Sequence, residues 1–176
     1  MTDAMPTIRV GLLTAALVAA LIRSTDAMTA EPASRMGSFR LDAPCARAFP
    51  LFTPLGERTW AQGWNPELLS GSEERGSVFR TRSHDTETLW IVADYRPAQG
   101  RVSYARLKQG SNFGLVDVEC RDVAGGSEIT VRYTLTGISA EGDAFVRDFL
   151  AEEAYASFID EWQRTIDAVL KEGGGS

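Results

Sequence analysis

The stretch AFVRDFLAEEAYASFIDEWQRTIDAVLK, residues 144–171, contains neither Gly nor Pro. Its apolar side chains recur at spacings of three and four residues, which places them on one stripe of an α-helix. The members of this stripe are Phe145, Phe149, Tyr155, Phe158, Ile159, Trp162, Ile166, Val169 and Leu170. Gly173 then ends the helix. One long amphipathic helix predicts a sheet whose apolar face the stripe can cover.

The segments that precede this helix have the composition of β-strands. Five of them are rich in Val, Ile, Thr, Tyr and Phe, and short separators containing Gly, Ser, Asn or Asp lie between them. They cover residues 77–82, 86–96, 101–109, 113–121 and 128–136. Turns this short make neighbouring strands antiparallel. With an alternating strand at 37–42, the sequence predicts an α+β fold: a curved antiparallel sheet of about six or seven strands around the terminal helix.

Two short helices are expected between the first strand and the meander. Pro44 suits the first turn of a helix over residues 45–52, which Pro50 bends or shortens. Asn65 and Pro66 have the residue types of a cap and a first helical position, so a second helix of a turn or two is expected there.

Length and charge restrict the classes of function. The chain has 176 residues, which suits one domain, and 44% of them are apolar and 24% charged, as in soluble globular proteins. A formal charge of -6 without any basic block disfavours nucleic acid as a partner. Cys45 and Cys120 are too few for a zinc cluster; they either pair in an exported domain or remain separate buried thiols.

The amino-terminal region differs from the remainder of the chain. Residues 10–22 form an apolar run preceded by Arg9, which matches a secretory signal peptide and is too short for a comfortable membrane span. We therefore expect residues 1–30 to be a signal peptide or dispensable segment, 31–35 a linker, 36–171 the domain and 172–176 a flexible tail. The protein would be secreted or periplasmic, whereas a start at Met28 or Met36 would make it cytoplasmic, and a retained anchor is a third reading.

The order of elements resembles a known superfamily. The segments CARAFPLFTPLGERTWAQGWNP, residues 45–66, and FIDEWQRTIDAVL, residues 158–170, are similar to the helix-grip or SRPBCC proteins. These include START domains, pollen-allergen-like proteins and polyketide cyclase and dehydrase-like proteins. The resemblance covers residues 36–171 and is one of pattern. It implies a deep apolar cavity between sheet and helix that holds lipids, sterols, polyketides or other hydrophobic small molecules. No cofactor is expected.

Aromatic side chains are the candidates for lining such a cavity. Trp60 and Trp64 are placed where the resemblance implies a lid, with capping of the core as the alternative and Trp64 as the one nearer the cavity. The further candidates are Trp90, Tyr104, Phe113, Tyr133, Phe145, Phe149, Phe158 and Trp162. Alternation puts Trp90, Val92 and Asp94 on one face of their strand, although the inward face is left open.

Few residues have the chemistry of a catalytic site. His84 is the only histidine and lies in an expected hairpin turn, so neither a Ser-His-Asp triad nor a metal-ligand pattern can be assembled. Asp94 and Glu119 interrupt apolar runs, which fits either a carboxyl in a cavity or the solvent face of a strand.

Three functions follow from these observations. The sequence favours a non-enzymatic carrier of a hydrophobic small molecule, since it supplies aromatics and lacks a catalytic set. A polyketide cyclase or dehydratase-like enzyme is the second hypothesis and requires converging polar groups in the cavity. A co-chaperone-like interaction module is the third; it predicts an exposed apolar patch on the outer face of the sheet and little interior volume.

Overall fold

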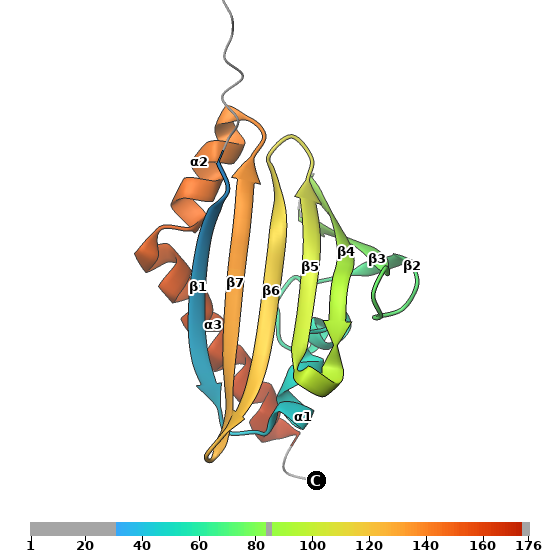
Figure 1. Cartoon of the computed structure of the whole chain (residues 1–176), viewed down its shortest axis with the longest axis vertical. Coiled ribbons are helices and arrows are strands. Elements are labelled where there is room, and N and C mark those ends of the chain that lie inside the picture. The colour runs from blue at the N-terminus through green and yellow to red at the C-terminus, as the bar shows by residue number, and fades with distance from the viewer. Residues whose placement is uncertain (1–30, 84–85, 174–176) are drawn as a thin grey trace, which may run out of the picture.

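A computed structural model of the chain describes residues 31–83 and 86–173, and the expected signal peptide and His84 lie outside them. Seven strands form one antiparallel sheet in the order β1-β7-β6-β5-β4-β3-β2 (Figure 1). Their bounds are β1 Ala33–Leu41, β2 Glu67–Ser70, β3 Val78–Ser83, β4 Thr86–Arg96, β5 Arg101–Lys108, β6 Asn112–Val123 and β7 Gly126–Gly137. The predicted curved sheet is confirmed, and β1 begins at Ala33, within the stretch assigned to a linker.

Helical elements lie between β1 and β2, between β4 and β5, and after β7. They are α1 Cys45–Ala48, the 3-10 helices η1 Phe49–Phe52 and η2 Gly56–Thr59, η3 Pro97–Gln99, α2 Ala140–Phe149 and α3 Glu152–Glu172. The prediction of a helix at Asn65 and Pro66 is wrong. The residues that follow form the edge strand β2, which pairs with β3 and places Glu67 opposite Arg80. The second short helix is η2, earlier in the chain.

The single long terminal helix is also a prediction that the structure corrects. Residues 150 and 151 interrupt it, and Ala151 has an extended backbone with φ -60° and ψ 145°. The interruption frees the Leu150 carbonyl, which accepts a hydrogen bond from Nε of Arg35 on β1. Leu150 itself is buried. Packing therefore overrides helical periodicity here, and α2 lies against β7 while α3 turns towards β1.

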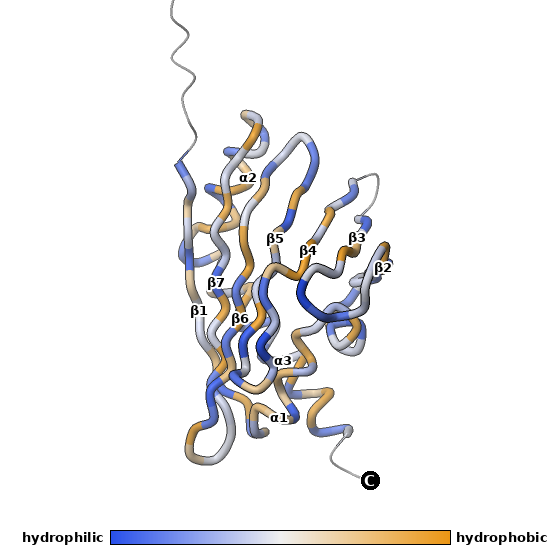
Figure 2. Tube along the Cα trace, turned by 45° about the vertical axis from the view of Figure 1, so that its right-hand side comes forward, coloured by the Kyte–Doolittle hydropathy of each residue, from blue (hydrophilic) through white to orange (hydrophobic). Residues whose placement is uncertain are grey.

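Contacts between α3 and the β1–β7 side of the sheet hold the helix in place. Tyr155 donates a hydrogen bond from its hydroxyl to the Val131 carbonyl at 3.0 Å. Gly37 on β1 has no side chain, and a Cβ there would lie 2.7 Å from Cγ1 of Ile159. Figure 2 shows α3 along the concave side of the sheet. The close approach at Gly37 lets the helix sit on this half of the sheet.

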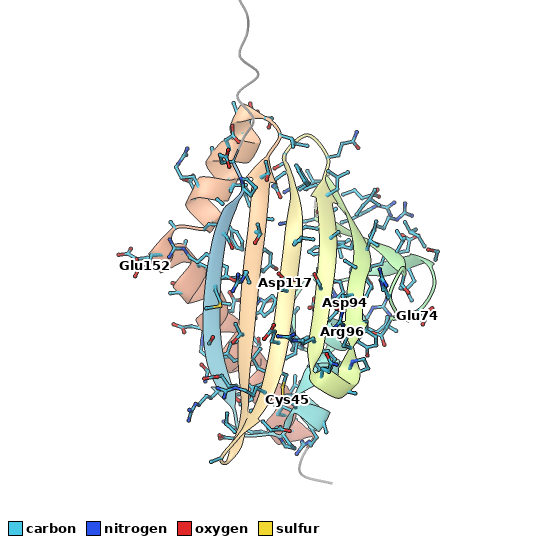
Figure 3. All side chains as sticks on the ribbon, viewed as in Figure 1. Cys45, Glu74, Asp94, Arg96, Asp117 and Glu152 are labelled. Atoms are coloured by element: carbon cyan, nitrogen blue, oxygen red, sulfur yellow. A yellow bond between two sulfur atoms is a disulfide. The ribbon has the colours of Figure 1, made fainter. Side chains whose placement is uncertain are left out.

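A β-bulge in β4 changes which side chains face the helix. Val92 pairs with Tyr104, but the next pair is Asp94 with Ser103, so the register shifts between them. Trp90 and Val92 are buried, whereas Asp94 lies on the opposite face and pairs with Arg96 at 2.8 Å. The expectation that all three share a face is therefore wrong for Asp94, because the extra residue inverts the alternation. Figure 3 shows Asp94 and Arg96 on the outer face together with Asp117.

A disulfide joins the short helices to the sheet. Cys45 at the start of α1 is bonded to Cys120 on β6, and the two are separated by 75 residues. The pairing that the sequence left open is thus settled. The bond anchors the segment that leads through η1 and η2 to Trp60 and Trp64.

Loss of this disulfide is expected to destabilise the domain. Replacing both Cys45 and Cys120 by Ala should lower the free energy of unfolding by about 2–4 kcal/mol, because closing a long loop restricts the unfolded chain. Urea denaturation of the oxidised wild type and the double variant measures the difference. With reductant present the two proteins should unfold at nearly the same urea concentration; a wild type unaffected by reductant would contradict the assignment.

Candidate functional site: an aromatic cavity between sheet and helices

A cavity of about 550 Å³ lies between the inner face of the sheet and the helical elements. Strands β3 to β7 form one wall, and the segment around η2 together with α2 and α3 forms the other. This volume is within the range of small-molecule sites. The cavity exists because α3 covers the β1–β7 side of the inner face, so the β3–β5 side needs another cover.

Nine of the ten aromatic candidates line this cavity. They are Trp60, Trp64, Trp90, Tyr104, Tyr133, Phe145, Phe149, Phe158 and Trp162. All four tryptophans of the chain are among them. Ligand binding by these residues stays a prediction, but the structure brings them together from β4, β5, β7, α2, α3 and the segment after η2.

Phe113 is the candidate that the structure places elsewhere. It is 48% exposed and lies on the outer face, beside Leu107 and next but one to Leu115 along β6. Both neighbours are exposed as well, so the outer face carries apolar side chains near the β5–β6 turn. The misplacement has a simple physical reason: β6 alternates, and its buried residues Val116, Val118 and Cys120 are in the opposite phase.

Trp60 and Trp64 belong both to the core and to the cavity wall. The Trp60 indole donates to the Leu51 carbonyl at 2.7 Å, and the Trp64 indole donates to the Pro54 carbonyl at 2.9 Å. The Trp60 ring meets Trp162 edge-on at 5.0 Å, whereas Trp64 meets Trp90 at 5.5 Å. Both rings therefore pack with the core and border the cavity, and a ligand-facing role for either of them stays a prediction.

The two tyrosines of the wall differ in how their hydroxyl groups are used. Tyr104 donates to the Phe52 carbonyl at 2.8 Å, so its hydroxyl hydrogen already has an acceptor. No hydrogen bond joins the Tyr133 hydroxyl to another described residue, although the side chain is only 7% exposed. Burial raises the pKa of Tyr133 above its ordinary value, so the hydroxyl stays protonated and can donate to a ligand.

One buried carboxyl group lies in the wall, and sequence reasoning missed it. Glu57 of η2 is 8% exposed, and its side chain makes no hydrogen bond or ion pair with another described residue. Burial raises its pKa well above the ordinary value, which favours the neutral acid. A single 3-10 turn has no periodicity from which burial could be inferred. Asp94 and Glu119, the carboxylates considered from sequence, instead pair with Arg96 and Arg101 on the outer face.

Two basic residues of β5 also line the cavity. Arg106 and Lys108 are in phase with the buried Val102 and Tyr104, and this alternation is the signal that could have identified them. The Arg106 guanidinium lies 5.3 Å from the centre of the Trp90 ring. The Lys108 ammonium lies 5.6 Å from the centre of the Phe145 ring. The wall therefore combines aromatic faces with two cations of β5, whereas Arg82 of β3, which also lines it, pairs with Glu67 and Glu87.

The described residues contain neither a metal-ligand cluster nor a membrane-spanning helix. In residues 31–83 and 86–173, no cluster of three His, Cys, Asp or Glu side chains is arranged to hold a metal ion. Within the same ranges, no helix combines the length and the apolar composition that crossing a membrane requires.

Solved structures share this architecture, whereas no family model and no curated protein matches the sequence. Norcoclaurine synthase from Thalictrum flavum superposes with a TM-score of 0.61 at 10% identity, covering 96% of this chain and 99% of its own. The Zhui aromatase/cyclase from Streptomyces sp. R1128 gives 0.62 at 10% identity, covering 83% and 100%. An uncharacterised Rhizobium leguminosarum protein gives 0.61 at 18% identity, covering 80% and 97%. At these identities the shared feature is the fold, and this chain has the helix-grip fold.

Proposed function

We propose that this protein binds and carries a hydrophobic small molecule in the cavity between its sheet and its terminal helices. The observation that carries the proposal is the cavity of about 550 Å³, whose wall contains aromatic residues from β3, β4, β5, β7, the segment after η2, α2 and α3. Burying an apolar ligand there is favourable by roughly 25 cal/mol for each Å² of apolar surface removed from water. Norcoclaurine synthase and the Zhui aromatase/cyclase share this fold, which supports small-molecule binding at the level of the fold.

The interaction-module hypothesis fits less well. Exposed apolar residues are present on the outer face, among them Leu107, Phe113 and Leu115. A module of that kind was expected to have little interior volume, and the cavity is large enough for a small molecule. Ligand binding therefore accounts for more of the described structure.

An enzymatic role has one specific observation in its favour. Glu57, as a neutral buried acid, and the Tyr133 hydroxyl both face the same cavity. A carboxyl group with a raised pKa can donate a proton to a bound substrate near neutral pH. A cyclase or dehydratase-like reaction that needs proton transfer is accordingly the second candidate function.

Filling the cavity should weaken ligand uptake. Thr88 lies on β4 in the cavity wall, so Thr88→Trp is expected to weaken binding of the neutral dye N-phenyl-naphthylamine by about tenfold or more, a loss of about 1.4 kcal/mol or more. Thr136→Trp, opposite Phe113 on the outer face, is the matched control and should bind as the wild type does. Dye fluorescence titrations measure both. Equal weakening by the two variants, or none by Thr88→Trp, would contradict the proposal.

The buried acid should be visible in the pH dependence of stability. Because the folded-state pKa of Glu57 is raised, folded wild type holds a proton that the unfolded chain releases above its own ordinary pKa, and stability falls as pH rises through that range. Glu57→Gln removes this loss. The variant is expected to be more stable than wild type at pH 7, with the advantage vanishing near pH 4. Urea denaturation across this range checks it; a wild type more stable than Glu57→Gln at pH 7 would exclude a neutral Glu57.

The disulfide supports an extracytoplasmic location, which we propose on that ground. Bonds such as Cys45 to Cys120 persist in oxidising compartments and are rare in a reducing cytosol. The mature protein is then expected to begin after the apolar run at residues 10–22. Amino-terminal sequencing of protein isolated from its native cells tests this, and a mature chain that still contains the run would contradict cleavage.

A further inference from the structure

Arg106 is a desolvated cation without a counter-ion in the described structure. Its Nε is fully buried and has no hydrogen-bond acceptor. No acidic side chain in residues 31–83 or 86–173 forms an ion pair with its guanidinium. Burial lowers the pKa of Arg106 from its ordinary value, yet a guanidinium remains charged in proteins. Desolvation of such a charge opposes folding unless something compensates it.

The contrast with the outer face makes this lack of a partner informative. Arg101, five residues earlier on the same strand, pairs with Glu119 at 2.7 Å. Arg80 on β3 pairs with Glu67 at 2.7 Å. These arginines are partly or largely exposed, where an unpaired charge would cost little. The arginine for which pairing would matter most is thus the one that the fold leaves unpaired.

The remaining charges of the cavity do not neutralise Arg106. Lys108 adds a second cation on the same wall, above the Phe145 ring. Glu57 is the buried carboxyl of the described wall, and its neutral form is favoured. Glu161 is an exposed residue at the rim. The inside of the cavity is therefore positive in a protein whose formal net charge is -6.

The shape of the wall restricts the body of the ligand. Phe79 and Trp90 are stacked with 4° between their planes, and the Arg106 guanidinium lies over Trp90. Tyr104 meets both rings edge-on. Flat ring faces and edges around a cavity make favourable stacked and edge-to-face contacts with another aromatic ring.

We propose that the ligand is an aromatic carboxylic acid, with its carboxylate bound by Arg106 and its ring system held among Trp90 and the neighbouring aromatic side chains. This inference rests on the proposed function and specifies the ligand class for the same cavity. A carboxylate matches the planar fork of a guanidinium in two parallel hydrogen bonds. Lys108 strengthens the attraction for an anion from the same strand. Binding supplies the counter-ion that the described residues lack.

A matched pair of probes separates the anionic head from the aromatic body. β-Naphthoic acid and β-naphthamide have nearly the same shape, and at pH 7.5 only the acid is charged. Calorimetric titration of wild type should give a dissociation constant about tenfold or more lower for the acid, as expected for one charge-assisted pair. Arg106→Met should bring the acid to within about threefold of the amide, because the acid loses more affinity than the amide does.

Arg101→Met is the matched control, since it removes the same charge from the outer face of the same strand. It should keep the preference for the acid. Equal affinity of wild type for both probes would overturn the carboxylate inference and leave the proposed function standing. Full acid preference in Arg106→Met would overturn the role of Arg106. Failure of both probes, and of the neutral dye, to bind wild type would overturn the proposed function itself. The wild-type comparison stands even where a variant does not fold.

Discussion

One helix is too narrow to cover the inner face of a seven-stranded sheet, and this mismatch determines most of the structure. Helix α3 packs closely on the β1–β7 side, where Gly37 allows the approach and Tyr155 reaches the Val131 carbonyl. The inner face of β3 to β5 has apolar side chains that must still be kept from water. The η2 segment and α2 close over that side without filling it. The cavity is therefore the part of the interior that the helix does not reach.

The cavity wall has to satisfy two demands that differ in their physical basis. Its aromatic rings belong to the same cluster as the core, so they contribute to folding whether or not a ligand is present. The charge of Arg106 does the reverse, because a desolvated and unpaired guanidinium opposes folding. Residues that lower the stability of the fold and make no compensating contact are commonly found at functional sites. The charge of Arg106 therefore indicates a binding site more specifically than the aromatic side chains of the wall do.

Sequence periodicity was sufficient for the architecture and insufficient for the site. Alternation and turn composition identified the antiparallel sheet, and the helical stripe identified its cover. The same reasoning could not foresee the bulge that turns Asp94 outward, since one inserted residue leaves composition unchanged. Nor could it detect the interruption at Leu150, which depends on an arginine from a distant strand. Glu57 is buried by tertiary packing alone. Arg106 and Lys108 had a usable signal, because they share the phase of Tyr104 along β5.

The location of the tryptophans gives the molecule an intrinsic optical label for its interior. Trp60, Trp64, Trp90 and Trp162 account for every indole in the chain, and each borders the same cavity. The near-ultraviolet emission of the folded protein consequently arises from that space alone, with no background from indoles on the outer surface. Occupancy of the interior, its hydration and its polarity can all be followed in unmodified protein, in dilute solution and in real time.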